Sequence, residues 1–294
     1  MAIGDVNNDG FPDIYLSGNQ VKNKLFLNKG GLKFEDITTK IHLEEKEGWK
    51  TGAAMADING DGLIDIYLCY SGNAPQEGMT APLINDYKPR SNQLFINQGL
   101  DKNGLPTFKE QANEYGVDAI GTFSTQAYFL DYDLDGDLDL FLLNHANKFY
   151  NIFFNVTMLR SKRHPYYGNQ LYENQGDKFV EVSEKAGIDG TGINFGLSAA
   201  ISDLNKDGYP DIFVTNDYSE QDFCYLNNGD GTFLNRTRSS GFTNQLWSSS
   251  AAFFDGDNDG WLDLYVTNYV EYSIDKNPWC GEQRSGHRAY CDPD

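Results

Sequence analysis

A nine-residue acidic motif occurs five times in this chain and constrains its fold more than any other feature. The pattern is Asp-x-Asp/Asn-x-Asp-Gly-x-x-Asp, and the copies begin at Asp5, Asp57, Asp131, Asp203 and Asp255. Carboxylates this close together repel one another unless a cation lies between them. Oxygen ligands around a turn-forming glycine are typical of a hard cation, and they favour Ca²⁺ over Mg²⁺.

The motifs belong to a longer repeat. Successive copies start 52, 74, 72 and 52 residues apart, which indicates a unit of 52 residues with insertions in two copies. An apolar run such as Ile14-Tyr15-Leu16 follows each motif, and a run rich in Gly, Ala and Ser precedes motifs two to five. A third run is marked by Asn-x-Leu-Phe/Tyr-x-Asn, and a fourth passes through Phe34, Phe108, Phe179 and Phe233.

Four short strands per unit, with almost no helical periodicity, predict an all-β chain. We expect a β-propeller of four-stranded antiparallel blades, forming a single domain over 1–294. The blade segments are expected at about 1–45, 46–118, 119–190, 191–243 and 244–294. A β-sandwich with coincidental turns is the alternative, and five copies in matched order disfavour it.

The same motif also begins an EF-hand, which needs a Glu at position 12 and a helix on each side. Position 12 is apolar in every copy and lies in an expected strand, so the EF-hand is excluded. The Asp at position 9 is expected to close the loop instead. The side chains of positions 1, 3, 5 and 9 and the carbonyl of position 7 are therefore the predicted ligands of about five structural Ca²⁺ sites. They belong to Asp5, Asn7, Asp9, Phe11 and Asp13; Asp57, Asn59, Asp61, Leu63 and Asp65; Asp131, Asp133, Asp135, Asp137 and Asp139; Asp203, Asn205, Asp207, Tyr209 and Asp211; and Asp255, Asp257, Asp259, Trp261 and Asp263.

On these residues the unit resembles the FG-GAP or VCBS-type repeat of integrin-α-like β-propellers. Phe195-Gly196 followed by Ala199-Ala200 is similar to the elements that name the repeat. The closing segment 280–291 resembles one found in the ASPIC/UnbV-associated branch. Because propellers of this family have seven blades, the resemblance implies an incomplete ring and a fragment of a longer protein.

Composition limits the possible functions. The net charge of −20 argues against binding nucleic acid through its phosphates. No apolar run reaches the length of a membrane span. The first motif begins too close to Met1 to leave room for an export signal, so we expect either that the signal lies upstream or that the protein is not exported. Cys280 and Cys291 could form one disulfide, which would imply an oxidising compartment. We therefore expect an extracellular, periplasmic or cell-surface location.

The insertions suggest where a ligand binds. Segments 71–91, 144–168 and 269–294 all follow the second strand of a blade, so we expect them on the face opposite the calcium loops. Arginine and aromatic residues, which are enriched at recognition surfaces, gather in these segments. The candidate ligand face comprises Arg90, Arg160, Arg163, His164, Tyr166, Trp279, Arg284, His287 and Arg288.

No catalytic motif accompanies this face. The sequence contains no His-Glu-x-x-His, no Gly-x-Ser-x-Gly and no phosphate-binding glycine loop. We expect a non-catalytic adhesion module that binds a protein or an acidic glycan. The alternative is a polysaccharide lyase that uses Arg, His and Tyr of the insertions, and this rests on analogy of fold.

Overall fold

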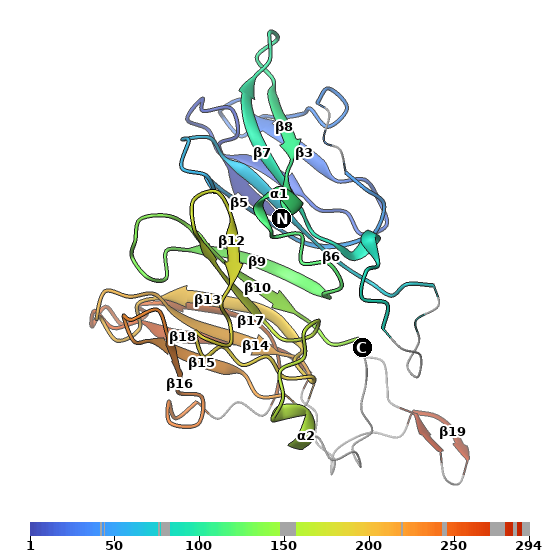
Figure 1. Ribbon diagram of the computed structural model, residues 1–294, viewed down its shortest axis with the longest axis vertical. Helices are drawn as coiled ribbons and strands as arrows, with labels where there is room; N and C mark the ends of the chain where they lie inside the picture. The colour runs from blue at the N-terminus through green and yellow to red at the C-terminus, as the bar shows by residue number, and fades with distance from the viewer. Residues whose placement is uncertain are drawn as a thin grey trace.

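The computed structural model describes residues 1–41, 43, 45–75, 77, 83–147, 157–218, 220–242, 246–270, 280–284 and 287–289. Its regular structure is dominated by antiparallel sheets, four of which have four strands paired in chain order (Figure 1). The strands of the first two sheets are β1 (Ala2–Gly4), β2 (Asp13–Leu16), β3 (Lys24–Asn28), β4 (Phe34–Asp36), β5 (Trp49–Ala56), β6 (Asp65–Ser71), β7 (Gln93–Leu100) and β8 (Pro106–Glu110).

The third and fourth sheets repeat this order, and a fifth has two strands. These are β9 (Ser124–Leu130), β10 (Asp139–Asn144), β11 (Gln170–Asn174) and β12 (Phe179–Glu181); β13 (Gly196–Ser202), β14 (Asp211–Asn216), β15 (Phe223–Asn227) and β16 (Phe233–Asn235); and β17 (Trp247–Phe254) with β18 (Asp263–Val270). Two short strands, β19 (Cys280–Arg284) and β20 (His287–Ala289), form a separate hairpin. The prediction of an all-β fold built from four-stranded antiparallel blades is confirmed.

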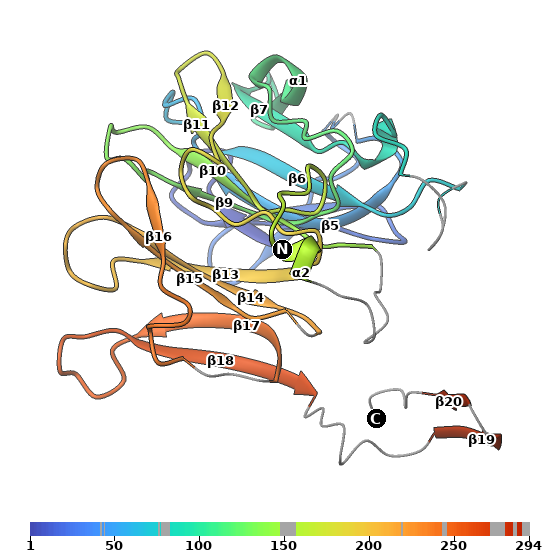
Figure 2. The ribbon, with the colours of Figure 1, turned by 60° about the horizontal axis from the view of Figure 1, so that its bottom comes forward.

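The sheets lie side by side in chain order, as the blades of a propeller do (Figure 2). The first strand of each sheet contacts the first strand of the next, from β1 and β5 through to β13 and β17. Small residues make this approach possible. A Cβ atom on Gly52 of β5 would lie 2.4 Å from the carbonyl oxygen of Thr125 on β9, which is too close for any side chain.

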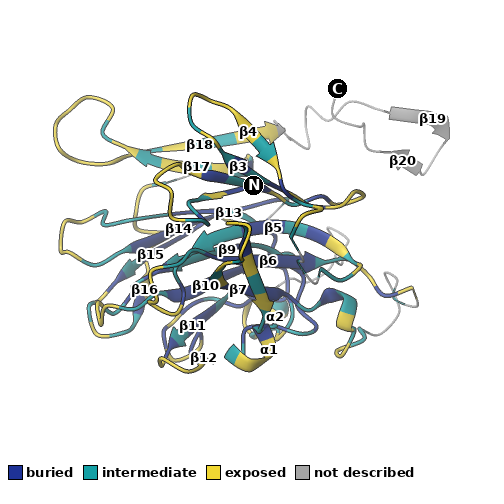
Figure 3. Cartoon of the chain, turned by 90° about the horizontal axis from the view of Figure 1, so that it is seen from above, coloured by how far each residue is buried: buried dark blue, intermediate teal, exposed yellow. Residues whose placement is uncertain are grey.

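The hydrophobic cores lie between the blades rather than within them. Along β6, Ile66 and Leu68 point into a core shared with the first sheet, whereas Tyr67 and Cys69 point into a core shared with the third. The alternation follows from the two-residue period of a strand. All four side chains are fully buried, because this strand is covered on both faces (Figure 3). Burial of each large apolar side chain contributes roughly 1.5–3 kcal/mol.

The fifth sheet has one half-buried and one open face. Phe253 of β17 packs edge-on against Phe213 of β14, so this face continues the core between blades. On the other face, Tyr265 is 60% exposed, although the residue at the same repeat position in the fourth sheet, Phe213, is 2% exposed.

Among the described residues, helical structure is confined to single turns. They are the 3₁₀ turn η1 (Lys88–Arg90), α1 (Ala112–Tyr115) and α2 (Thr157–Arg160). Within the described part of the chain, no helix has the length and apolar character needed to cross a membrane.

Candidate calcium loops and insertion face

Each acidic motif forms the loop between the first and second strands of its blade. The backbone makes the same tight path in all five loops, because positions 4 and 6 both have positive φ. At position 4 the φ angles are 55° to 71°, and at the glycine of position 6 they are 84° to 99°. No atom would touch a Cβ on Gly136, so glycine is needed there for its backbone conformation and not for space.

The first carboxylate of each loop binds backbone N–H groups on the far side of the turn. Asp5 accepts hydrogen bonds from the N–H groups of Asp9 and Gly10, at 3.1 and 2.7 Å. Asp57, Asp203 and Asp255 accept the equivalent pairs in their own loops. These bonds fold each of the four loops back onto its first carboxylate.

In the first four loops, the Asp at position 9 is buried and holds the loop to the blade, whereas the equivalent Asp263 of the fifth loop is exposed. In the second loop, Asp65 Oδ2 accepts from the N–H of Ile58 at 2.9 Å, and Oδ1 accepts from the N–H of Asn97 at 2.8 Å. Asp13, Asp139 and Asp211 make the same two bonds. Each oxygen keeps a second lone pair, so this structural role leaves the carboxylate able to bind a cation.

Burial makes these carboxylates costly to ionise without a cation. It raises the pKa of Asp65 and that of Asp139 to about 7, even though the hydrogen bonds from backbone N–H groups act in the opposite direction. In the third loop, burial and the neighbouring Asp135 and Asp133 carboxylates raise the pKa of Asp137 to about 6. A bound cation would supply the missing charge compensation.

The third loop fits a divalent cation best. Asp131, Asp133 and Asp139 each place a carboxylate oxygen within 4.8 Å of the others. Asp131 Oδ1 and Asp137 Oδ1 are buried and lack a hydrogen-bond partner, which is costly unless an ion or water binds them. Asp255, Asp257 and Asp259 converge in the same way in the fifth loop. These are the two loops with Asp rather than Asn at position 3.

The described residues of the first two insertions lie at the opposite end of the strands from the acidic loops (Figure 2). Their described residues pack onto the blades through a hydrophobic cluster at the start of β9 and after the end of β10. We call this end of the blades the insertion face. The buried members of its cluster are Phe123, Ala146, Tyr167, Ile193 and Phe195, and Leu83, Leu159, Tyr166 and Tyr218 pack against them.

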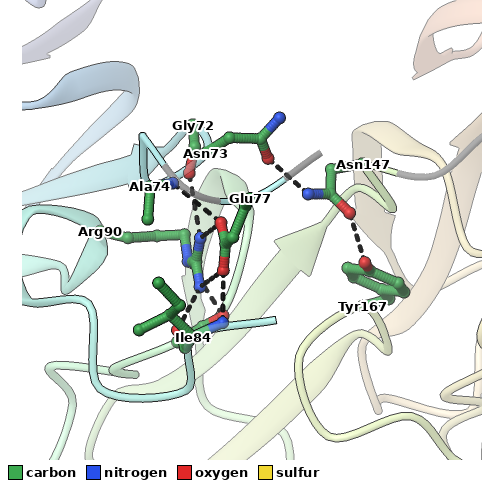
Figure 4. Close-up of polar contacts among 9 residues, drawn as sticks. Gly72, Asn73, Ala74, Glu77, Ile84, Arg90, Asn147 and Tyr167 are labelled. Atoms are coloured by element: carbon green, nitrogen blue, oxygen red, sulfur yellow. Dashed lines mark hydrogen bonds and ion pairs between the residues drawn. The ribbon is translucent and has the colours of Figure 1, made fainter. Parts of the chain in front are cut away.

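Arg90, predicted to face a ligand, is fully buried instead (Figure 4). Its guanidinium forms a two-point ion pair with Glu77, at 2.7 and 3.3 Å, and donates to the carbonyl oxygens of Gly72, Ile84 and Gly121. It also lies 4.0 Å above the ring centre of Phe123. Arg90 therefore fixes the first insertion to the blade, and its side chain does not reach solvent.

Two further predicted arginines are bound within the protein. Arg163 donates to the carbonyl oxygens of Ile188 and Asn169, at 3.0 and 2.6 Å, and pairs with Glu181. Arg160 is 45% exposed and joins α2 to Glu220 of the fourth blade, with Nε 3.2 Å from the carboxylate. Of these two, only Arg160 has a substantially exposed side chain.

His164 and Tyr166 lie beside these arginines. The His164 ring stacks on Tyr167 with centroids 4.0 Å apart, and its Nδ1 accepts from the N–H groups of Tyr166 and Tyr167. The other predicted face residues, Trp279, Arg284, His287 and Arg288, have side chains outside the described residues, as do Cys280 and Cys291.

The prediction of ligands omitted one recurring group that contacts the loops. The last Asn of the third-strand motif, at Asn28, Asn97, Asn174 and Asn227, donates from its backbone N–H to the position 9 carboxylate. Its recurrence in the motif was visible in the sequence. Which loop this Asn contacts depends on strand pairing and on packing between blades, and neither can be predicted from the motif alone.

Comparison with known proteins agrees with this geometry. A family model described as an FG-GAP-like repeat matches residues 5–68 and 203–266. Each match runs from the start of one acidic motif to the second strand of the following blade. Cartilage acidic protein 1 of Xenopus tropicalis is 26% identical over 146 residues, which cover 50% of this chain and 19% of that protein. The predicted resemblance is confirmed: the chain carries FG-GAP-like repeats, folded as consecutive antiparallel blades.

Proposed function

We propose that this chain is a non-catalytic, calcium-stabilised binding module of an extracellular or cell-surface protein. The proposal gives the two ends of the blades different tasks. The acidic loops hold Ca²⁺ as a structural ion, and the insertion face recognises a protein or an acidic glycan. FG-GAP-like repeats and the likeness to cartilage acidic protein 1 support a binding role in an extracellular setting.

The unpartnered buried oxygens of Asp131 and Asp137 support calcium in the third loop. Asp131, Asp133 and Asp139 would hold the ion there, and the other loops would use the equivalent positions. When bound, Ca²⁺ supplies positive charge to carboxylates that otherwise repel one another. It has no part in any reaction under this proposal.

The observation that carries the binding role is the way the insertions are fixed. Buried Arg90 and Glu77 anchor the first insertion, and the pair of Arg160 and Glu220 joins the second to the next blade. Loops held rigidly on a stable scaffold are a common place for recognition residues. Around this anchored core, Met158 and Lys162 are exposed to solvent.

A binding screen with charge-reversal variants tests the proposal. The protein, loaded with calcium, would be applied to arrays of extracellular proteins and of uronate-containing polysaccharides, including alginate and heparin. Lys162→Glu should abolish or strongly weaken a captured interaction. Lys102→Glu is the matched control, because Lys102 is also exposed but lies at the tip of the β7–β8 hairpin.

The outcome separates recognition through the insertion face from other modes of binding. If both lysine variants bind as the unaltered protein does, recognition does not use the exposed part of α2 and its flank. Release of unsaturated products from a polysaccharide would contradict the non-catalytic role.

A further inference from the structure

An asparagine side chain connects each pair of neighbouring acidic loops in the first four blades. Asn97 on β7 is buried, and its Nδ2 donates to two carbonyl oxygens. One belongs to Ile64, in the loop of its own blade, at 3.0 Å; the other belongs to Val6, in the loop of the preceding blade, at 2.9 Å. A single amide thus bridges two loops that are far apart in sequence.

The bridge recurs at the same repeat position. Asn174 donates to Ile58 in the second loop and to Leu138 in the third, at 3.3 and 3.1 Å. Asn227 donates to Tyr132 in the third loop, at 2.7 Å, and to Pro210 in the fourth, at 3.3 Å. The first four loops are therefore linked in series by three buried amides.

Each bridge ends on the groups that shape the candidate metal site. Val6 is the second residue of its loop, and its N–H donates to Asp13 Oδ2 while its carbonyl oxygen accepts from Asn97. The backbone N–H of Asn97 donates to Asp65 Oδ1 in the next loop. Asp13 and Asp65 are the position 9 carboxylates of the two loops, so each bridge connects one candidate ligand to the next.

We propose that Asn97, Asn174 and Asn227 are positioning residues that make calcium binding cooperative among the first four loops. This inference rests on the proposed calcium sites. An ion in one loop fixes its position 9 carboxylate, and the bridging amide then orders the neighbouring loop. The second ion binds a loop that is already ordered, so less conformational entropy is lost on binding. Coupling at the lower end of the usual range would tighten the second site about fivefold.

The fifth loop is connected by a different contact. Lys206, at position 4 of the fourth loop, places its ammonium 3.9 Å above the ring centre of Trp261 in the fifth. Among the described residues, no asparagine bridge joins these two loops. The fifth loop therefore provides an internal comparison, expected to fill independently of the other four.

Asn28 provides a matched control for the bridging residues. It occupies the same repeat position, and its N–H donates to Asp13 at 2.8 Å. Its Nδ2 donates to Pro12 in its own blade, and no bond to another loop is present among the described residues. In both Asn28 and Asn97, Oδ1 accepts from the N–H of the glycine two residues later. Serine keeps a weaker form of that turn and removes the amide donor.

Calorimetric titration of the calcium-free chain with Ca²⁺ tests the inference. The unaltered protein and Asn28→Ser should show a cooperative phase followed or accompanied by one independent site. Asn97→Ser should lose about fivefold in affinity at the linked sites, with a Hill coefficient closer to 1. Asp57→Ala removes a ligand of the second loop and should weaken the remaining linked sites, whereas Asp257→Ala should not. Melting followed by circular dichroism establishes that each variant is folded.

The possible failures are distinct. Independent sites in the unaltered protein would overturn the cooperative mechanism and leave structural calcium intact. An Asn97→Ser variant that folds and retains the full Hill coefficient would also overturn it. If Asn97→Ser does not fold, Asn227→Ser and Asp57→Ala test the same coupling at other loops. If no calcium binds, the proposed calcium-stabilised function fails, and this inference fails with it.

Discussion

The buried pair formed by Arg90 and Glu77 leads to the sharpest prediction about stability. Both side chains are excluded from solvent, with exposed fractions of 0% and 1%. Arg90→Met keeps an unbranched apolar side chain in the site but leaves the Glu77 carboxylate, among the described residues, with only the N–H groups of Ala74 and Ile84 as donors. Removing one partner of a buried ion pair costs about 3–5 kcal/mol.

Urea denaturation of the unaltered protein and of Arg90→Met would measure this loss. Lys24→Met is the control, because Lys24 pairs with Asp36 at the surface, where side-chain exposure is 46% and 38%. Exposed pairs contribute about 0–1 kcal/mol. Adding Glu77→Gln to Arg90→Met should recover part of the stability, because it removes the uncompensated charge.

The pH dependence provides a second signature of the same pair. Burial of Glu77 acts to raise its pKa, but the hydrogen bonds from Arg90, Ile84 and Ala74 outweigh it and hold the pKa below its usual value. The resulting stability is present above the unfolded pKa and is lost as pH falls through the folded pKa. Without Arg90, burial should raise the Glu77 pKa, so the deficit of Arg90→Met should shrink between pH 7 and pH 5. A deficit no larger than that of Lys24→Met would refute this account of Arg90.

Three further outcomes follow from the loops. Removing calcium with a chelator should lower the melting temperature, because at about tenfold over Kd each site adds roughly 1.4 kcal/mol; an unchanged melting curve would contradict structural calcium. The destabilisation caused by calcium removal should be smaller at pH 5.5 than at pH 7.5. Because the pKa of Asp65 and that of Asp139 are raised to about 7, protonation of these carboxyl groups stabilises the metal-free fold below about pH 7. This stabilisation is lost as the pH rises. Calcium-loaded and dialysed metal-free protein, melted at both pH values, measure the loss, and an equal or larger loss at pH 5.5 would be contrary evidence. Gly136→Ala should lower the free energy of unfolding by about 1–2 kcal/mol, because the φ angle of Gly136 is +99°. Leu134→Gly, at a φ angle of +59°, should leave the stability unchanged or increase it. Thermal denaturation compares the two variants, and equal effects would show that backbone strain is not decisive.

The order of strands could be predicted from the sequence because the signals are local and recur. The acidic motif fixes the turn between two strands, and the apolar run after it has the length of a buried strand. The run of small residues in β5 likewise suits a crowded first strand, and Gly52 lies against Thr125 of the next blade. Five repetitions of one pattern compensate for the weakness of each signal taken alone.

The environment of individual polar residues could not be predicted in the same way. Arg90 and Arg160 are both arginines in polar insertions, yet one is fully buried and the other is 45% exposed. Their difference depends on Glu77, which lies in the same insertion as Arg90, and on Phe123 and Glu220, which come from other parts of the chain. Asn97 was recognised as a marker of a strand, but its contact with Val6 spans 91 residues and depends on how two blades pack.

The placement of the cores between blades has a consequence for how such a chain can change in length. A blade is the unit that repeats in the sequence, but the smallest part that encloses a core is a pair of neighbours, as Ile66 and Tyr67 show by pointing to opposite sides of one strand. Duplication or loss of one repeat therefore creates or removes a whole interface. Such an event can be tolerated when the new neighbours present matching faces. Extra residues in the loops leave every interface intact, which fits the confinement of the insertions to the ends of the strands.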